Sequence, residues 1–293
     1  MSGIAESNRL STLHQSARAA AMSIASAPVS WGIMESVEPP SEYPYSRVLD
    51  EIAKAGYAGT ELGPYGFLPA DAAKLREELN KRSLTLCSAF VAIPLGNRAA
   101  RSDGLAQVLR TARLVSAVGC RLLILSDEIS AERCAVAGRR DEANRLSWTE
   151  AEWKDVFPAV SEVVDRCREF GVRLAFHHHV GTHVETPEEV DRLLTSFSPS
   201  DLGLCLDTGH CVYGGESRRS CSRDMPTEFI ASISRILIQS AWKMHAGNTW
   251  IFTGPCTREF LRPSGRAWLI SQRYLPCCVV TALVVGSLLS KMY

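Results

Sequence analysis

The sequence predicts an α/β protein in which residues 23–216 form most of a TIM (β/α) barrel, with strands seven and eight not recognisable. Short apolar runs alternate with longer amphipathic ones, the pattern of parallel strands joined by helices. No GxGxxG pattern follows the first apolar run, which argues against a dinucleotide-binding sheet. Small and polar residues share one side of the later strands, as they do inside a barrel. The 293-residue chain is 46 % hydrophobic and can fill such a core.

The expected elements follow the chain in order, after an N-terminal extension over residues 1–22. Strands are expected at 24–28, 57–62, 84–90, 121–125, 172–179 and 202–207, and helices at 45–55, 70–82, 104–118, 151–170 and 187–197. Gly56, Gly119 and Gly171 come just past three of the helices, where glycine commonly ends a helix. The Thr-Pro-Glu-Glu run at 186–189 matches a capping box at the start of the last helix. These segments make six strand–helix steps.

The alternation of side chains in the last two strands predicts which face points inward. In the strand at 172–179, Ala175, His177 and His179 share one face, and bulkier residues share the other. In the strand at 202–207, Cys205 and Asp207 share a face opposite three leucines. We therefore expect small residues inside the barrel and polar residues at the C-terminal strand ends, where barrel enzymes carry out their chemistry.

His177 and Asp207 are the predicted ligands of a divalent metal ion. His177 and His179 lie two positions apart on one strand, so both imidazoles can reach one centre, and Asp207 on the next strand can add an oxygen ligand. Mixed nitrogen and oxygen ligation favours Mn or Co, and Mg, Fe or Zn would also be accepted. The alternative interpretation is a loop of surface histidines and an aspartate that caps a helix.

Further polar residues at strand ends are candidate substrate contacts. Glu61 ends the second strand on the face predicted to point inward, and the alternative is a solvated loop carboxylate. Trp31 follows the first strand and could stack on a sugar ring or cover the barrel mouth. Glu185 comes eight residues after His177, a position compatible with contact to the substrate pocket. The alternative is that it only precedes a helix N-terminus, where negative charge is favourable.

Charge and composition limit the classes of partner. The formal net charge of zero combines 29 acidic and 22 basic residues at 1–216 (−7) with 3 acidic and 10 basic residues at 217–293 (+7). The basic residues of the tail are dispersed among apolar ones, so we expect no nucleic-acid partner. The apolar run at 275–289 is too short to span a bilayer, so no membrane partner is expected. Ten cysteines without a CxxC pair predict reduced thiols in a cytoplasmic protein, and a homo-oligomer is compatible with the sequence.

Three ordered motifs resemble the myo-inosose-2 dehydratase family of the xylose-isomerase-like barrels, a superfamily of sugar-phosphate isomerases and epimerases. The motifs are GYAGTELGP at 56–64, HHHVGT at 177–182 and DTGH at 207–210, and the resemblance covers residues 22–215. It implies that Asp207 is the metal ligand of strand six and that His177 occupies the ligand position of strand five, where related barrels use Glu. It also implies that His179 and His210 contact the substrate or support the ligands.

The resemblance implies a lyase that acts on a small keto-polyol such as 2-keto-myo-inositol. In this reaction a divalent cation assists removal of a proton α to the carbonyl, and a β-hydroxyl then departs. No residue of the chain is thereby identified as the catalytic base. A sugar or hydroxypyruvate-type isomerase or epimerase, or a 3-dehydroshikimate dehydratase, would share the first step. A non-catalytic barrel fragment is the alternative outside the enzyme class.

Residues 217–293 depart from the family pattern. The HxKD and VVEQD motifs, which complete the family's metal site on strands seven and eight, are missing. We therefore read the tail one nucleotide out of frame, so that each new codon consists of the last base of one codon and the first two bases of the next. This frame permits His-Phe-Lys-Asp at 233–236 and Val-Val-Glu-Gln-Asp-Val at 288–293. We interpret the tail as the product of a one-nucleotide frame slip near Glu216, which would leave this form inactive. The alternative is a divergent C-terminal segment.

Overall fold

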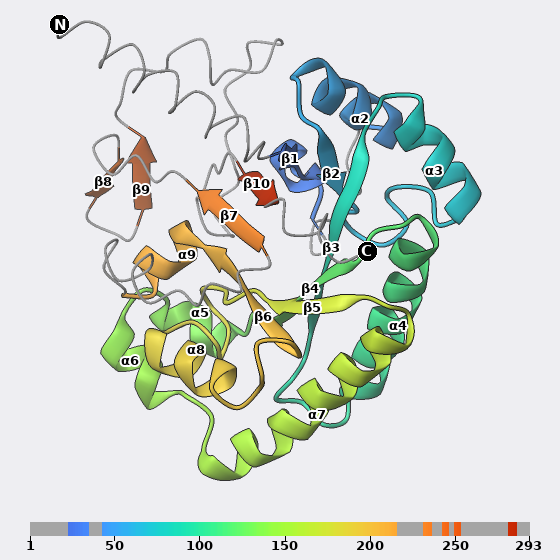
Figure 1. Cartoon of the computed structure of the whole chain (residues 1–293). Coiled ribbons are helices and arrows are strands. Elements are labelled where there is room, and N and C mark those ends of the chain that lie inside the picture. The colour runs from blue at the N-terminus through green and yellow to red at the C-terminus, as the bar shows by residue number, and fades with distance from the viewer. Residues whose placement is uncertain are drawn as a thin grey trace, which may run out of the picture. The chain divides into compact units, whose positions relative to one another are not determined.

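A computed structural model describes residues 23–34, 43–215, 231–235, 242–245, 249–252 and 281–285 of the chain (Figure 1). The described residues divide into two units. One contains those up to Ser234 together with Thr281–Val285, and the other contains those from Arg235 to Phe252. In the second unit, β8 (Trp242–His245) and β9 (Thr249–Phe252) form an antiparallel pair. The predicted extension at 1–22 lies outside the described residues, as does most of 217–293.

The six predicted strands and five predicted helices are all present. The strands are β1 (Ser23–Ser26), β2 (Gly59–Glu61), β3 (Thr85–Ile93), β4 (Leu122–Asp127), β5 (Arg173–Phe176) and β6 (Leu202–Asp207). The helices are α2 (Tyr45–Lys54), α3 (Ala72–Asn80), α4 (Arg101–Ala117), α7 (Glu150–Glu169) and α8 (Pro187–Leu194). Four short helical elements were not predicted: η1 (Pro28–Trp31), α5 (Ala131–Val136), α6 (Arg140–Arg145) and α9 (Thr208–Tyr213). None of the helices in the described part has the length and apolar character needed to cross a membrane.

The strands pair in the order of a barrel. Neighbouring strands from β1 to β6 are parallel, and the ring order is β1-β10-β7-β6-β5-β4-β3-β2. The two remaining positions are taken by β7 (Ala231–Arg235), which is parallel to β6, and by β10 (Thr281–Val285), which is antiparallel to β1. A regular TIM barrel contains only parallel strands. The prediction of an incomplete barrel with six regular strands is therefore confirmed.

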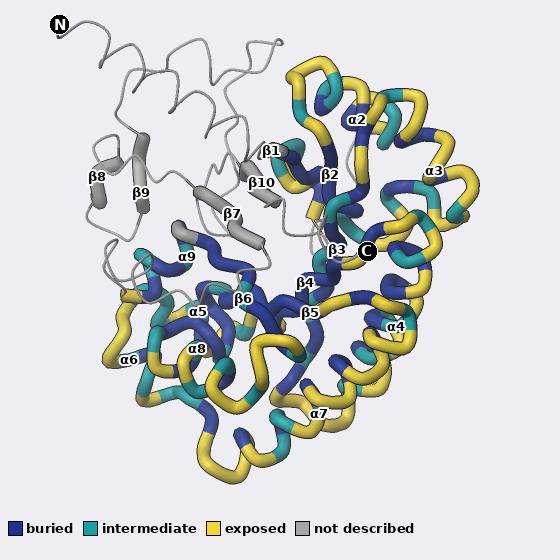
Figure 2. Tube along the Cα trace, viewed as in Figure 1, coloured by how far each residue is buried: buried dark blue, intermediate teal, exposed yellow. Residues whose placement is uncertain are grey.

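Two apolar clusters separate the helix-facing side of the sheet from its interior. Leu174, Phe176 and Leu202 pack with helix residues in the larger cluster. Ala175 and Cys205 form the smaller, interior cluster with Ala25, Leu122 and Ile124. The predicted inward face of β5 and β6 is thus confirmed, and Figure 2 shows these strands buried beneath helices with exposed outer faces.

Two local features differ from the expectations. The fifth strand ends at Phe176 instead of residue 179, because hydrogen bonds from Thr182 N to His179 O and from His179 N to Val184 O turn the chain out of the sheet. Cys87, Cys120, Cys134 and Cys167 are free thiols, as predicted, whereas Cys211 is disulfide-bonded.

Gly59 allows β2 to lie close to β3. A Cβ atom at this position would lie 2.6 Å from the carbonyl oxygen of Thr85, a backbone atom that cannot move aside cheaply. We expect Gly59→Ala to lower the free energy of unfolding by about 1–3 kcal/mol, the usual cost of overpacking. Urea denaturation followed by circular dichroism would measure it. An unchanged midpoint would show that β2 can shift at no cost.

Candidate metal and substrate site

Polar residues gather at the C-terminal ends of the strands. Glu61 ends β2, Asp207 ends β6 and His177 directly follows β5. All three side chains are buried, at 8 %, 0 % and 3 % exposure. Because the C-terminal ends of parallel strands meet at one edge of the sheet, this edge is the candidate site.

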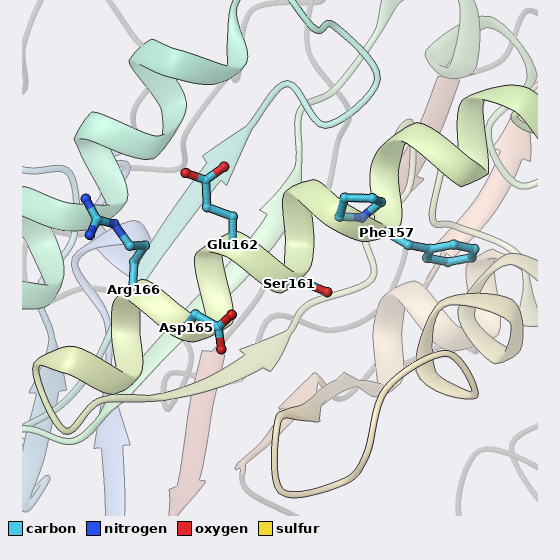
Figure 3. Close-up of a pocket in the computed structure, with 6 residues that line it drawn as sticks. Phe157, Ser161, Glu162, Asp165 and Arg166 are labelled. Carbon is cyan, nitrogen blue, oxygen red and sulfur yellow. The ribbon is translucent and has the colours of Figure 1, made fainter.

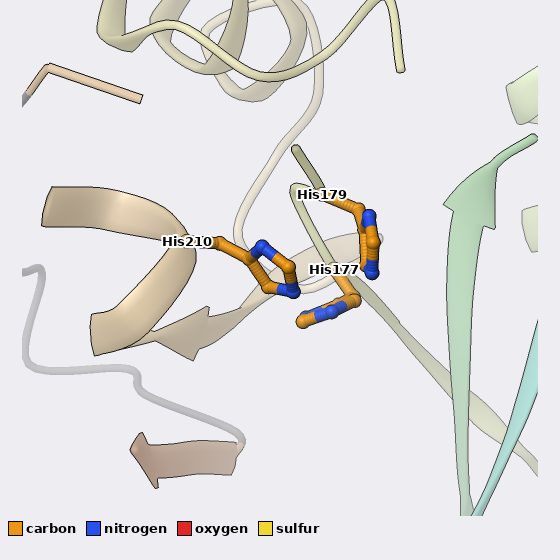
Figure 4. A group of neighbouring side chains, drawn as sticks. All are labelled: His177, His179 and His210. Atoms are coloured by element: carbon orange, nitrogen blue, oxygen red, sulfur yellow. The ribbon is translucent and has the colours of Figure 1, made fainter. Parts of the chain in front are cut away.

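Three imidazole rings converge beside β5 and β6. One ring nitrogen from each of His177, His179 and His210 lies within 4.8 Å of the other two (Figure 4). The rings of His179 and His210 are closest, with centroids 3.9 Å apart, and His177 lies 5.5 and 5.3 Å from them. The backbone N–H of His177 donates to Leu125 O at 2.7 Å, which fixes the start of this segment against β4. The structure thus unites two of the predicted substrate residues with a predicted metal ligand.

The peptide groups of Val180 orient two of these rings. His179 Nδ1 lies 2.7 Å from Val180 O, an acceptor, so the Nδ1 of His179 carries a proton. The N–H of Val180 donates to His210 Nδ1 at 3.3 Å, so that nitrogen carries a lone pair. In the neutral rings, Nε2 of His179 is consequently a proton acceptor and Nε2 of His210 a proton donor.

Asp207 lies beside the histidines and also caps a helix. Its Oδ1 accepts the N–H groups of Gly209 at 2.8 Å and His210 at 3.0 Å, at the N-terminus of α9. Its Oδ2 is 3.8 Å from His210 Nε2. The helix cap, the alternative interpretation of this aspartate, is therefore present, and its bonds hold His210 next to Asp207; the role of Asp207 as a metal ligand stays a prediction.

Glu61 faces the barrel interior, as its position on β2 predicts. The pairing of β2 with β3 shifts register between Thr60 and Glu61, which brings Ser88 opposite Glu61. The Ser88 hydroxyl donates to Glu61 Oε1 at 2.7 Å. Burial raises the pKa of the Cys87 thiol, and the negative charge of Glu61 raises it further. Because Cys87 packs against the interior cluster, the Glu61 carboxylate lies near the interior as well.

Trp31 and Glu185 contact other parts of the protein. Trp31 Nε1–H donates to Glu51 Oε2 at 2.6 Å, and its ring packs on the helix-facing core. The two carboxylate oxygens of Glu185 accept the N–H groups of Gly138 and Gly181, at 2.8 and 2.7 Å. Burial raises the pKa of Glu185, and these two bonds oppose the rise. Glu185 therefore holds loops together, and Trp31 anchors η1 to α2.

Three residues near the site were not predicted. The ring of Phe90 meets that of His177 edge-on at 5.8 Å. Asp127 accepts the N–H groups of Leu95 and His183, both at 3.1 Å, and so ties two loops to the end of β4. The third residue is Ser126. It was missed because the predicted strand ended at residue 125, whereas β4 continues to Asp127. Following the two-residue alternation past Ile124 would have identified Ser126 as inward-facing.

A shallow hollow on the outer helical layer lies apart from these residues. It follows one face of α7 and is lined by Phe157, Pro158, Ser161, Glu162, Asp165 and Arg166 (Figure 3). Its five residues other than Phe157 are exposed, and none of the predicted site residues belongs to it. The strand ends remain the candidate site.

Comparison with known proteins identifies the family of barrels to which the chain is similar. The model of the xylose isomerase-like TIM barrel family matches residues 49–248. The chain is 30 % identical over 189 residues to inosose dehydratase of Geobacillus kaustophilus, covering 64 % of this chain and 61 % of that protein. It is 34 % identical over 201 residues to rhizopine catabolism protein MocC of Rhizobium meliloti, covering 68 % and 60 %. The chain spans about three fifths of the length of these relatives.

Solved structures show the same fold. The crystal structure of the IOLI protein with a zinc atom matches with a TM-score of 0.51 and 16 % identity. The match covers 67 % of this chain and 66 % of that one.

Proposed function

Because this chain belongs to the xylose isomerase-like TIM barrel family, we propose that it is a divalent-metal-dependent dehydratase acting on a keto-inositol such as 2-keto-myo-inositol. The relatives named inosose dehydratase support this substrate class. The observation that carries the proposal is the convergence of His177, His179 and His210 beside Asp207 at the ends of β5 and β6.

The donor groups fit a transition-metal cation. His177 offers an imidazole nitrogen and Asp207 a carboxylate oxygen, both buried, and this mixed set suits Co, Mn, Zn or Fe better than Mg, which prefers oxygen alone. We assign His177 and Asp207 to the cation. A divalent cation bound there would polarise a substrate carbonyl and acidify the adjacent C–H group.

His179 and His210 are suited to a dehydration. The reaction needs a base for the C–H group α to the carbonyl and a proton for the departing β-hydroxyl. The carbonyl of Val180 holds a proton on Nδ1 of His179, so Nε2 of that ring is the proton-accepting nitrogen. The N–H of Val180 donates to Nδ1 of His210, so Nε2 of that ring carries the proton and can hold a hydroxyl by a hydrogen bond. We therefore assign His179 as the base that takes the α-proton and then returns it to the departing hydroxyl, which leaves as water, and His210 as the hydrogen-bond donor that positions this hydroxyl.

The metal and proton roles predict different losses. We expect His177→Ala to weaken Co²⁺ binding by at least about 100-fold. Loss of a residue that only hydrogen-bonds a metal ligand already weakens binding by about 10- to 100-fold, and loss of a ligand itself should weaken it at least as much. His210→Ala should lower turnover by about 10²–10⁴-fold and change Co²⁺ affinity by less than about tenfold. Calorimetry with Co²⁺ and a dehydration assay would measure both, with each variant made in the chain whose other reading frame is restored after Glu216.

His183→Ala is the matched control, because the His183 ring stacks on Trp148 at 5.1 Å outside the three-histidine group. This variant should leave both the Co²⁺ affinity and the turnover close to those of the parent. Equal losses of Co²⁺ affinity in His177→Ala and His210→Ala would instead mean that all three imidazoles hold the cation.

The hydrogen-bond donor assigned to His210 favours a dehydratase over an isomerase or epimerase. Those enzymes return the proton to carbon and expel no hydroxyl, whereas the N–H group of His210 can hold a departing one. A panel of 2-keto-myo-inositol, 3-dehydroshikimate and ketohexoses, assayed with Co²⁺ or Mn²⁺ on the chain whose other reading frame is restored after Glu216, separates the reactions. Epimerised ketohexose without any dehydrated product would overturn the proposal.

A further inference from the structure

We propose that Ser126 is a substrate-contact residue whose hydroxyl group hydrogen-bonds a ring hydroxyl of the bound polyol. This inference rests on the proposed function and extends it to a residue outside the histidine group. The ligand class it identifies is a neutral polyhydroxylated ring.

The position of Ser126 places it at the mouth of the barrel. Leu122 and Ile124, on the same strand, belong to the interior cluster. Two residues further along, Ser126 faces the same side at the C-terminal end of β4. Leu125 on β4 pairs with Phe176, the last residue of β5. The residues that follow this pair are Ser126 on β4 and His177 just past the end of β5. The proposed metal ligand and this hydroxyl are therefore neighbours across β4 and β5.

The hydroxyl group of Ser126 is buried without a hydrogen bond. The residue is 1 % exposed, and its Oγ has no partner within the part of the chain that the structure describes. Its register partner on β3 is Ala92, which offers only a methyl group. Ser88, another buried serine of the sheet, donates to Glu61. A buried hydroxyl that lacks a partner costs stability, and such a group at a site indicates a role in binding.

The chemistry of the position favours a neutral hydroxyl as the partner. A serine hydroxyl both donates and accepts hydrogen bonds, as does each hydroxyl of a polyol. The residues around Ser126 do not favour an anionic group, because Leu125 and the acidic Asp127 flank it and Ala92 lies opposite. A polyol ring in front of His177 would direct a hydroxyl toward Ser126.

The test compares two buried hydroxyls in the full-length chain with Co²⁺ present. Thr111 on α4 is also 1 % exposed and also lacks a partner within the described residues, but it packs on the helical side. Ser126→Ala and Thr111→Val each remove one such hydroxyl. Calorimetric titration with 2-keto-myo-inositol measures Kd, and thermal unfolding measures Tm.

We expect Ser126→Ala to weaken binding by about 3- to 10-fold, the value of one neutral hydrogen bond. Its Tm should stay the same or rise by about 1–3 °C, because an unpaired buried hydroxyl is removed. Thr111→Val should show the same Tm behaviour and a Kd within about twofold of the parent. A lower Tm with an unchanged Kd in Ser126→Ala would make this hydroxyl structural and overturn the inference, while the proposed function would stand. Failure of both the parent chain and its frame-restored form to bind keto-inositol would overturn both.

Discussion

Replacing Glu189 with alanine is expected to lower the free energy of unfolding by about 3–5 kcal/mol. Glu189 Oε2 lies 2.8 Å from Arg133 Nη2, and the two side chains are 2 % and 0 % exposed. Removing one partner of such a pair leaves an uncompensated charge in a medium that solvates it poorly, which is far more costly than losing a surface ion pair.

The same pair connects three segments around the histidines. Arg133, on α5, donates from Nε to Thr182 O at 2.7 Å and from Nη1 to Ala143 O. Glu189, on α8, accepts the N–H groups of Glu185 and Thr186 at 2.9 and 3.0 Å. The loop after β5, which begins with His177, is therefore held on both sides by one buried salt bridge.

Glu188→Ala is the matched control for this prediction. Glu188 precedes Glu189 on α8 and pairs with Arg140, but the two side chains are 51 % and 43 % exposed. The hydrogen bond from Arg140 lowers the pKa of Glu188 to about 2, yet solvent screening limits the stability gained, and we expect a loss below about 1 kcal/mol.

Glu189→Gln separates charge from hydrogen bonding. The amide oxygen can still accept the two N–H groups at the start of α8, so an intermediate loss is expected. Urea denaturation monitored by circular dichroism gives all three values. Similar losses for Glu188→Ala and Glu189→Ala would show that burial of the pair contributes nothing.

Local patterns in the sequence predict the regular elements well. The capping box at Thr186 and Glu189 is formed, and α8 starts at Pro187 as expected. The two-residue alternation correctly placed Ala175 and Cys205 in the interior. Such features depend on neighbours within a few residues, so their physical cause is visible in the sequence itself.

Contacts between distant segments could not be predicted in this way. Arg133 and Glu189 are 56 residues apart, and nothing in either local sequence identifies the other as its partner. The register shift that brings Ser88 opposite Glu61 depends on how two strands meet. The two six-residue helices α5 and α6 are too short to show an amphipathic period. The role of Val180 involves its backbone, which no residue type signals.

We propose that residues 217–293 arise from a one-nucleotide frame slip, and that restoring the other frame strengthens Co²⁺ binding by at least about 100-fold. Strand β7 pairs with β6 so that Ile233 lies opposite Asp207, the assigned metal ligand. The alternative frame permits histidine at position 233 as the start of His-Phe-Lys-Asp. It would therefore add an imidazole next to Asp207, and its second motif, near residue 290, would add a carboxylate. Each further ligand would tighten the site that we propose at His177 and Asp207.

The comparison needs the chain of 293 residues, the frame-restored chain and two single variants. Ile233→His introduces only the imidazole, at the position paired with Asp207, and should recover part of the gain, whereas Ser234→His, one register position further along β7, should recover little. Calorimetry with Co²⁺ and the dehydration assay would be run on all four. Full metal-dependent turnover by the 293-residue chain, or no gain in the restored one, would favour a divergent C-terminal segment that completes the site in another way.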